Sequence, residues 1–514
     1  MNNPVLGLFH DEGLYVTLAK SLSEGQGLRL LNLPTAPVQT KYPILYPYLL
    51  SWAWWLNPAF PDNAFLLKSI NGVFFFAVLV ITSLWIYRCF NENKNAALIA
   101  AALAVALVGS NPAIFSIVNR PLSETLFLMF VLLALLGFDQ KEDARFSFVH
   151  VAFLGIVAAL AYLTRTVGAA VIGAGGLHLL VRHRWRLLVI YSLTVALFFV
   201  PWTYWQQLHR PDHIESQILL YYVSYNYQPP AFILIWSDWS RAWLIVWGNL
   251  RYTFDSFASL FLLNALPILK YWVYPLLGIG AVVSLRKQTV FLWSFLLLYG
   301  FLILTWSWHP ARLMVPLIPL LVLFLLRGAY AMQTFLQTHI QVPWVQNRVG
   351  FWVMLPFAAL LTLNGMWLSL YVSESPENSL RLWFGKQALY SWQGFEETFA
   401  WIREHTKEKD ILASAYDPLY YLHTGRQAIR PWFYKPETYF YPYGKAVADV
   451  GSAQEVKREL VALGVDYLVI DPIDSLTAEE AVSQLFAELL RSYEGQAREV
   501  FVSADGFHKV YALP

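Results

Sequence analysis

Long apolar runs separated by short polar connections dominate the chain between residues 64 and 372. They lie at about 65–88, 95–112, 122–138, 148–164, 167–182, 186–206, 271–286, 289–306, 313–327 and 350–371. Each run is long enough, or nearly long enough, to cross a bilayer core about 30 Å thick. Because a segment in lipid must satisfy its own backbone hydrogen bonds, each run is predicted to be a helix. The pattern predicts an α-helical polytopic membrane protein with about 10–11 transmembrane helices.

The apolar pattern changes beyond residue 373. Helix-like stretches there alternate with short apolar strands, which is typical of a small sheet covered by helices. The expected helices are Phe395–His405, Ala453–Leu463 and Ala478–Leu490, and the expected strands are Ile411–Ala415, Asp466–Ile470, Glu499–Ser503 and Lys509–Leu513. Thr424-Gly425-Arg426 is predicted to be a turn. We therefore expect a soluble α/β domain at the carboxyl end of the chain.

Three regions follow from these patterns. Residues 1–63 form a first extramembranous loop with interfacial helices, and residues 64–372 form the transmembrane domain, interrupted by a long loop at about 207–268. Residues 373–514 form the α/β domain. In the long loop Trp236, Trp239, Trp243 and Trp247 recur at helical spacing. This spacing favours an amphipathic helix lying on the membrane, with substrate stacking as the alternative.

Basic residues indicate the orientation of the chain. Alternate connections carry Arg88, Lys94, Lys141, Arg145, Arg182, Arg184, Arg186, Arg286, Lys287, Arg327 and Arg348. Short cytoplasmic loops are enriched in Lys and Arg, so these connections are placed in the cytoplasm. Residues 1–63, the long loop and the carboxyl-terminal domain are then extracytoplasmic. An outside amino-terminal region predicts that the native protein has a further helix upstream of residue 1.

Composition agrees with the membrane assignment and excludes some functions. The chain is 57% hydrophobic and 14% charged, against about 25% charged residues in soluble domains. A net charge of +2 gives no reason to expect a nucleic-acid partner. The single cysteine, Cys89, excludes an intrachain disulfide and a CxxC metal site. Gly173, Gly175 and Gly176 lie inside an apolar run, where small residues favour close helix packing over a nucleotide loop.

Ionisable residues in the predicted outside connections are the candidates for chemistry. Asp11 and Glu12 precede a helix-like stretch, Gly13 to Leu22, and are either helix-capping acids or a general base at the membrane surface. Lys41, in Thr40-Lys41-Tyr42-Pro43, is either a surface lysine or a cation that holds a lipid phosphate.

The remaining candidates flank the predicted spans. Arg120 and Glu124 stand before the third span, where Glu124 is either a capping acid or faces a polar cavity. Arg165 lies in a tight hairpin, and His309 and Arg312 lie at the outer end of the ninth span, where structural snorkelling is the alternative to anion binding.

One topology places all of these residues on the same side of the membrane. They are Asp11, Glu12, Lys41, Arg120, Glu124, Arg165, His309 and Arg312. Cations at such an interface suit the binding of a polyprenyl phosphate, and an acid there suits removal of a proton from an acceptor. The sequence has no HExxH or other firm metal spacing, and a divalent metal held by scattered acids and His309 stays open.

The order of these features resembles the C-type membrane glycosyltransferase (GT-C) superfamily, whose members include protein O-mannosyltransferases and the lipid A aminoarabinose transferase. The resemblance covers about residues 10–330 and rests on the first-loop acidic pair, the Lys41-Tyr42-Pro43 segment and Arg312 before Pro316. The family's corresponding lysine segment has two prolines, whereas one is present here. Thr40 stands where the aminoarabinose branch has an acid, which puts a metal site of that type in doubt.

The resemblance implies an inverting glycosyltransferase that uses a polyprenyl-phosphate sugar and a glycan, lipid or protein acceptor. Asp11 takes the place of the catalytic acid, with Glu12 and Glu124 orienting the acceptor or the base. Lys41, Arg165 and Arg312 are expected to bind donor phosphate, and Arg120 and His309 are further candidates. The expected location is a bacterial inner membrane, with the active site extracytoplasmic. A transporter or flippase of a lipid-linked saccharide, or a non-catalytic scaffold, remains an alternative.

Overall fold

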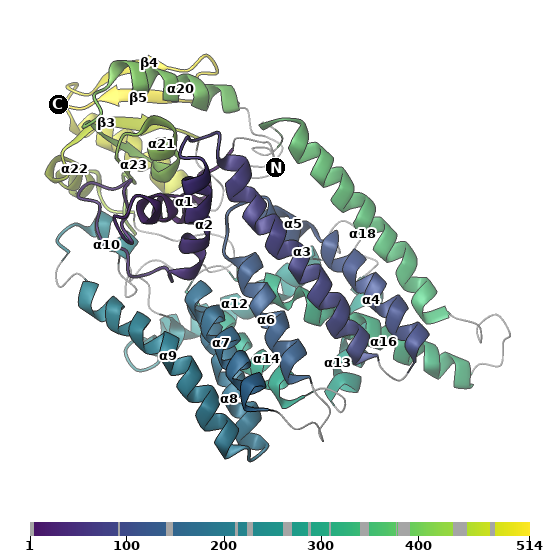
Figure 1. The fold of residues 1–514 in the computed structure, drawn as a ribbon. Coiled ribbons are helices and arrows are strands. Elements are labelled where there is room, and N and C mark those ends of the chain that lie inside the picture. Colours follow the sequence, from purple (N-terminus) through teal and green to yellow (C-terminus); the bar gives the residue numbers. More distant parts are fainter. Residues whose placement is uncertain are drawn as a thin grey trace.

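The structure is a computed structural model. It describes residues 5–90, 93–139, 147–210, 214–223, 230–260, 270–285, 289–307, 310–339, 349–376, 378, 391–434, 450–472 and 479–514. Figure 1 shows a bundle of long helices with a smaller sheet-containing domain at one end, and helices α1 and α2 between the two.

Apolar helices build the bundle. They are α3 (Ala64–Cys89), α4 (Lys94–Gly109), α5 (Pro112–Val118), α6 (Glu124–Phe138), α7 (Phe148–Thr164), α8 (Ala169–Val181), α9 (Trp185–His209), α13 (Lys270–Leu285), α14 (Val290–Thr305), α16 (Ile318–His339) and α18 (Val349–Glu374). Every predicted apolar run overlaps one of these helices. The polytopic helical architecture expected from the sequence is therefore confirmed.

The described helices differ in how well they fit a bilayer. Three stretches, Ala64–Cys89, Trp185–His209 and Ala311–His339, are each long and apolar enough to span it. The pair Lys94–Gly109 and Pro112–Val118 passes the same test together, bent by 59° at the break. Large apolar side chains also face outward on the bundle, among them Phe76, Leu197 and Leu297. Lipid is the solvent that such a surface requires, and the protein is an integral membrane protein.

Glycines allow close packing where helices cross. A Cβ atom added at Gly280 would lie 1.7 Å from the Phe324 carbonyl oxygen, and one at Gly328 would lie 1.9 Å from the Leu276 oxygen. These glycines therefore let α13 and α16 approach backbone to backbone. Gly175 has the same role against Tyr191, whose hydroxyl would lie 2.4 Å from an added Cβ. The packing interpretation of the glycines in the fifth apolar run is thus supported at Gly175.

The described amino-terminal region before α3 contains two packed helices, α1 (His10–Ser23) and α2 (Leu45–Leu56). The Trp54 indole N–H of α2 donates to the Val16 carbonyl of α1 at 3.2 Å. The N-cap of α1 is Phe9, and Asp11 and Glu12 lie in the first turn. The interpretation of these acids as N-caps is therefore wrong, although their position still favours negative charge at the positive end of the helix dipole.

Helices also occupy the described parts of the long loop between α9 and α13: α10 (Gln217–Val223), α11 (Ala231–Leu234) and α12 (Trp239–Leu260). Trp239, Trp243 and Trp247 of α12 stack in series, with neighbouring ring centroids 6.4 and 6.3 Å apart. Their side chains are exposed. Trp236 precedes the helix, so the predicted helical tryptophan stripe has three members rather than four.

The carboxyl-terminal domain is a five-stranded sheet with helices packed on it. Its strands are β1 (Ile411–Ser414), β2 (Ala428–Ile429), β3 (Val465–Ile470), β4 (Arg498–Val502) and β5 (Lys509–Ala512), in the order β2-β1-β3-β5-β4. β1 is parallel to β2 and β3, and β5 is antiparallel to β3 and β4. The helices are α20 (Trp392–His405), α21 (Asp417–Thr424), α22 (Ala453–Ala462) and α23 (Glu479–Ser492). Gly425 ends α21 with φ +74°, which confirms the predicted turn.

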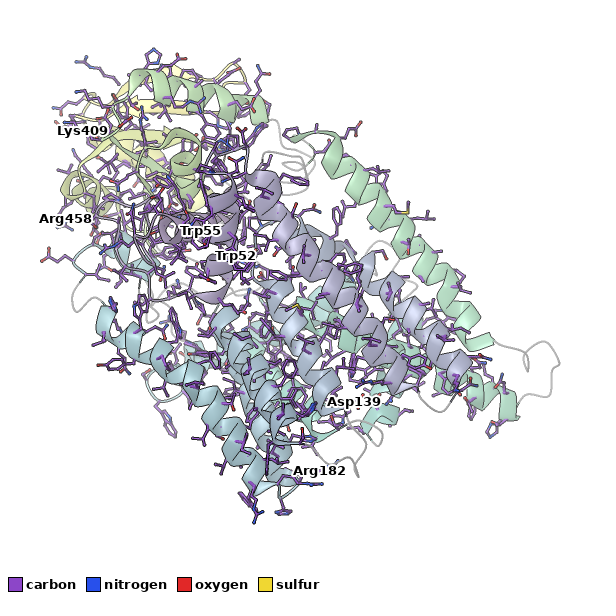
Figure 2. All side chains as sticks on the ribbon, in the orientation of Figure 1. Trp52, Trp55, Asp139, Arg182, Lys409 and Arg458 are labelled. Carbon is purple, nitrogen blue, oxygen red and sulfur yellow. The ribbon has the colours of Figure 1, made fainter. Side chains whose placement is uncertain are left out.

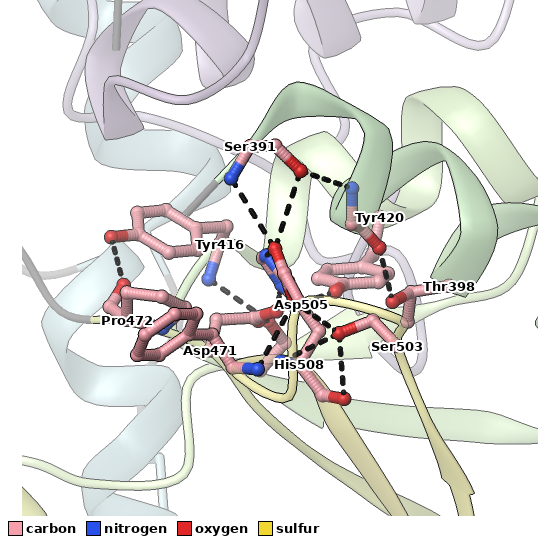
Figure 3. Close-up of polar contacts among 12 residues, drawn as sticks. Ser391, Thr398, Tyr416, Tyr420, Asp471, Pro472, Ser503, Asp505 and His508 are labelled. Carbon is pink, nitrogen blue, oxygen red and sulfur yellow. Dashed lines mark hydrogen bonds and ion pairs between the residues drawn. The ribbon is translucent and has the colours of Figure 1, made fainter. Parts of the chain in front are cut away.

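A buried polar cluster lies where β1 and β3 end in the carboxyl-terminal domain (Figure 3). His508 Nδ1 lies 2.9 Å from Asp471 Oδ1, which also accepts from the Tyr420 hydroxyl at 2.7 Å. Asp471 Oδ2 accepts from the Ser414 hydroxyl at 3.0 Å. The cluster ties β1, β3, α21 and the turn before β5 together. Buried polar groups of this kind are stable when they are hydrogen-bonded.

The domain is seated on the amino-terminal region through α21 and β2. The Ala428 N–H donates to the Asn32 carbonyl at 2.6 Å, and the Asn32 amide donates to Asp417 at 2.8 Å. At the α1–α21 contact, a Cβ atom at Gly13 would lie 2.4 Å from the Pro418 Cβ. The first and last parts of the chain therefore form one packed unit above the bundle (Figure 1).

Candidate functional site

The centre of the candidate site is Arg312, in the short helix α15 (Ala311–Met314). Its Nη1 donates to Asp11 Oδ2 at 2.6 Å, and its Nε donates to Glu124 Oε1 at 2.7 Å. Glu124 is the first residue of α6 and is almost fully buried. One guanidinium thus joins the carboxylate of α1 to the carboxylate of α6.

Arg165 extends this network from the other side of Glu124. It is the residue between α7 and the 3-10 turn Thr166–Gly168, and its Nη1 lies 2.6 Å from Glu124 Oε1. The same nitrogen donates to the Ser123 hydroxyl at 3.2 Å, and Ser123 in turn hydrogen-bonds the Tyr15 hydroxyl of α1 at 2.9 Å. The structure therefore brings Asp11, Glu124, Arg165 and Arg312 together.

Asp11 is the partly exposed acid of this network. Its side chain is 30% exposed, and its Oδ1 accepts from the Tyr42 hydroxyl at 2.8 Å. Burial alone would raise the pKa of Asp11, but the nearby Arg312 charge, helped by His10 and these hydrogen bonds, holds it well below its usual range. Asp11 is therefore ionised and paired, at a position that solvent can still reach.

Glu12 lies away from Asp11 although the two are neighbours in sequence. It is buried, and its Oε1 accepts from the Gly7 N–H at 2.9 Å. Burial raises the pKa of Glu12, while the charges of Arg120 and Lys68 and the Gly7 hydrogen bond oppose the rise. Glu12 and Arg120 therefore belong to a second buried charge group that holds the amino-terminal segment onto the start of α3.

Lys41 lies against Tyr221 of α10. Its Nζ donates to the Tyr221 carbonyl of α10 at 3.3 Å and lies 5.1 Å from the centroid of the Tyr221 ring. Burial lowers the pKa of Lys41 to about 8, with Arg430 acting in the same direction and Asp11 opposing it. Lys41 therefore shares the electrostatic environment of Asp11.

Three further residues at this place have no counterpart among the sequence candidates: His10, Asp417 and Arg430. His10 Nε2 lies 3.7 Å from Asp417 Oδ1, and the Arg430 guanidinium lies 4.8 Å from the Tyr221 ring centroid. Arg430 directly follows β2, and Asp417 opens α21 just after β1. The carboxyl ends of parallel strands are common positions for functional side chains, and this is the one signal that would have pointed to them.

A metal site finds little support in the described part of the chain. His309 falls outside the described residues. Within them, no group of three or more His, Cys, Asp or Glu side chains is placed to hold a metal ion. Two carboxylates of the site, Asp11 and Glu124, are bridged by the Arg312 guanidinium. The space between them therefore holds a cationic side chain, and this donor set does not fit a metal.

Comparison with known proteins identifies the fold. No family model matches the sequence, and no curated protein sequence is significantly similar to it. Among solved structures, ArnT from Cupriavidus metallidurans bound to undecaprenyl phosphate matches with a TM-score of 0.57 and 14% identity, over 98% of this chain and 94% of that one. The oligosaccharyltransferase of Archaeoglobus fulgidus, in its complex with Zn and sulfate, matches with a TM-score of 0.54 and 14% identity, over 100% of this chain and 70% of that one.

Both matches run through the membrane bundle and the carboxyl-terminal domain, because they cover nearly the whole chain. ArnT is a lipid A aminoarabinose transferase, and both proteins are members of the superfamily that the sequence resembles. The chain has the fold of the C-type membrane glycosyltransferases.

Proposed function

We propose that the protein is a glycosyltransferase that moves a sugar from a polyprenyl-phosphate donor to an acceptor on the extracytoplasmic side of the membrane. The observation that carries the proposal is a solvent-accessible carboxylate, Asp11, at the start of α1, which is paired with Arg312 and electrostatically coupled to Lys41. Two proteins with this fold were solved with lipid phosphates, ArnT with undecaprenyl phosphate and the oligosaccharyltransferase AglB with a dolichol-phosphate.

Asp11 acts as the base. The acceptor heteroatom attacks C1 of the sugar, and its proton moves to the Asp11 carboxylate. The C1–O bond to phosphate breaks on the opposite face, and its electron pair leaves with the polyprenyl phosphate, so the anomeric configuration inverts. Cations beside the departing oxygen stabilise the charge that develops there.

The Arg312–Asp11 pair can couple the basicity of Asp11 to donor binding. A carboxylate paired with arginine is a weak base, because the pair stabilises its ionised form. A phosphate that enters beside Arg312 competes with Asp11 for the same guanidinium. Partial release of Asp11 then raises its pKa and makes it a better proton acceptor when the donor is bound. Glu124, held by Arg165 as well, keeps Arg312 in place during this exchange.

The test is transfer in proteoliposomes, with radiolabelled polyprenyl-phosphate sugars as donors and envelope extract as acceptor. Asp11→Asn should lower the rate by about 10²–10³, the usual effect of removing one preorganised charge from an active site. Asp62→Asn is the matched control, because Asp62 is exposed in the same extramembranous region. Near-normal transfer by Asp11→Asn would show that Asp11 is not the base. If the donor crosses the bilayer and no new glycosidic product forms, the protein is a transporter and not a transferase.

A further inference from the structure

Two cations from distant parts of the chain lie against one aromatic ring. Lys41 Nζ is 5.1 Å and the Arg430 guanidinium carbon is 4.8 Å from the centroid of the Tyr221 ring. Lys41 belongs to the first extramembranous region, Tyr221 to α10, and Arg430 to the carboxyl-terminal domain after β2. All three side chains are partly exposed, so a ligand can reach them.

The other cations of the site already form ion pairs with carboxylates. Arg312 bonds both Asp11 and Glu124, and Arg165 bonds Glu124. These contacts neutralise the two carboxylates and leave less positive charge for an incoming anion. The sequence had assigned phosphate binding to Arg165 and Arg312 together with Lys41. Arg312 can therefore contact a phosphate only as it releases Asp11, and Lys41 and Arg430, which lie against Tyr221, can supply further positive charge to the same phosphate.

Arg430 has the features of a prepared anion ligand. Its Nε has no hydrogen-bond partner among the described residues. Its guanidinium also lies 5.1 Å from the Trp432 ring centroid, so that two aromatic rings orient it. Behind it the buried Asp417 is held by the Asn32 amide at 2.8 Å. The planar fork of arginine is suited to phosphate oxygens, which it binds through two N–H groups.

We infer that Arg430 binds the phosphate of the lipid-linked donor together with Lys41, so that the carboxyl-terminal domain completes the donor site. This inference rests on the proposed function. A polyprenyl-phosphate sugar is a phosphodiester with one negative charge, and the departing polyprenyl phosphate is a monoester with a charge between about −1.5 and −2. Lys41 and Arg430 therefore stabilise the phosphate most strongly as the C1–O bond breaks and its negative charge grows.

The experiment is a binding titration with the full chain in lipid nanodiscs. The probe is undecaprenyl monophosphate, and undecaprenol, which lacks the phosphate, measures the contribution of the lipid tail. Arg430→Gln should raise the Kd for the phosphate about ten- to a hundredfold, because it removes a charge-assisted hydrogen bond, and should leave undecaprenol binding unchanged. Arg458→Gln is the matched control, because Arg458 is an exposed arginine elsewhere in the same domain (Figure 2).

Arg430→Lys keeps the test valid where the glutamine variant folds poorly. It retains the charge but not the planar fork, so its Kd should lie between those of wild type and Arg430→Gln. Wild-type affinity in both Arg430 variants, with weak binding in Lys41→Gln, would overturn the role of Arg430 and leave the donor site standing. Equal binding of undecaprenyl monophosphate and undecaprenol by the wild type would overturn the proposed function itself.

Discussion

At the scale of single residues, the site depends on how Arg312 divides its hydrogen bonds. Its Nη1 donates a hydrogen bond to Asp11, and its Nε donates one to Glu124. Glu124 is nearly inaccessible to solvent, whereas Asp11 and Arg312 are each about a third exposed. Glu124 is thus the fixed anchor of the network, and Asp11 is the member that can exchange partners.

The anchor role predicts a large effect on stability. Glu124→Gln leaves Arg312 and Arg165 facing each other without their shared carboxylate, and loss of one member of a buried ion pair costs about 3–5 kcal/mol. We expect a marked fall in the melting temperature of the detergent-solubilised protein. Glu24→Gln is the control, because Glu24 is an exposed acid whose pair with Lys20 spans 3.8 Å, and exposed pairs contribute about 0–1 kcal/mol. Equal melting temperatures for the two variants would contradict the anchor role.

Asp417 predicts a pH effect on stability. Burial raises its pKa to about 7, with Arg430 and hydrogen bonds opposing the rise, against about 3.9 in an unfolded chain. Between these values the folded state keeps a proton that the unfolded state has lost, so stability falls as the pH rises. From pH 6.5 to 8 the Asp417 contribution is a loss of about 1 kcal/mol.

Melting curves of wild type and Asp417→Asn at both pH values measure this contribution. The wild type should lose more stability than the variant between pH 6.5 and 8, because asparagine does not titrate. Burial lowers the pKa of His10, with Arg430 and Lys41 acting in the same direction and Asp11 opposing. The neutral His10 therefore stabilises the folded state, and this stabilisation is lost as the pH falls below the pKa of histidine in the unfolded chain, about 6.5. Both proteins contain His10, so the comparison between them isolates the contribution of Asp417. Identical pH profiles for the two proteins would show that Asp417 is ionised at neutral pH.

At the scale of elements, helix α1 links the site to the carboxyl-terminal domain. Its first turn carries Asp11, and its next residues pack against α21 through Gly13 and Pro418. The position of the proposed base is therefore set by a contact between helices that are far apart in the sequence. The Tyr15–Ser123 hydrogen bond fixes the same helix to the start of α6.

Gly13→Ala tests this coupling. Its Cβ would lie 2.4 Å from the Pro418 Cβ, so α21 must move away, and overpacking of this kind costs about 1–3 kcal/mol. We expect a lower melting temperature and a lower transfer rate, since Asp11 shifts with α1. Gly278→Ala, in α13, is the control, because an added Cβ there meets no atom within 4 Å. A transfer rate that is unchanged in Gly13→Ala would show that the α1–α21 contact does not position the base.

The elements themselves were largely predictable from sequence, because apolar run length and strand–helix alternation are local properties. The Trp stripe failed only at Trp236, which precedes α12. The network was not predictable in the same way. The sequence could place Asp11 and Arg312 on one side of the membrane, but the two are 301 positions apart, and no local rule states that they pair. Arg430 was missed because it follows a strand of two residues, too short to stand out.

At the scale of the whole molecule, the two ends of the bundle differ in character. Figure 2 shows Lys409 and Arg458 on the carboxyl-terminal domain at one end, and Asp139 and Arg182 at the other. Trp52 and Trp55, both exposed, lie on α2 where the domain meets the bundle. Tryptophan is enriched at membrane interfaces, so we expect these residues to lie at one membrane boundary.

Sidedness is tested by labelling single cysteines. In a Cys89→Ser background, Lys409→Cys should react with an impermeant maleimide in intact spheroplasts. Arg184→Cys, at the exposed turn after α8, should react only after permeabilisation. The expectation follows from the basic connections that the positive-inside rule places in the cytoplasm. The reverse labelling pattern would invert the proposed orientation and place the site in the cytoplasm.

The packing of α21 against α1 has a consequence for biosynthesis. The contact that positions Asp11 joins α1 to α21, which is translated much later than α1. A nascent protein therefore carries the acid and most cations of its reaction centre long before it has the surface that positions them. Activity should appear only after α21 has been made and has docked on α1, so a stop codon placed between α16 and α21 should be as damaging as an early one.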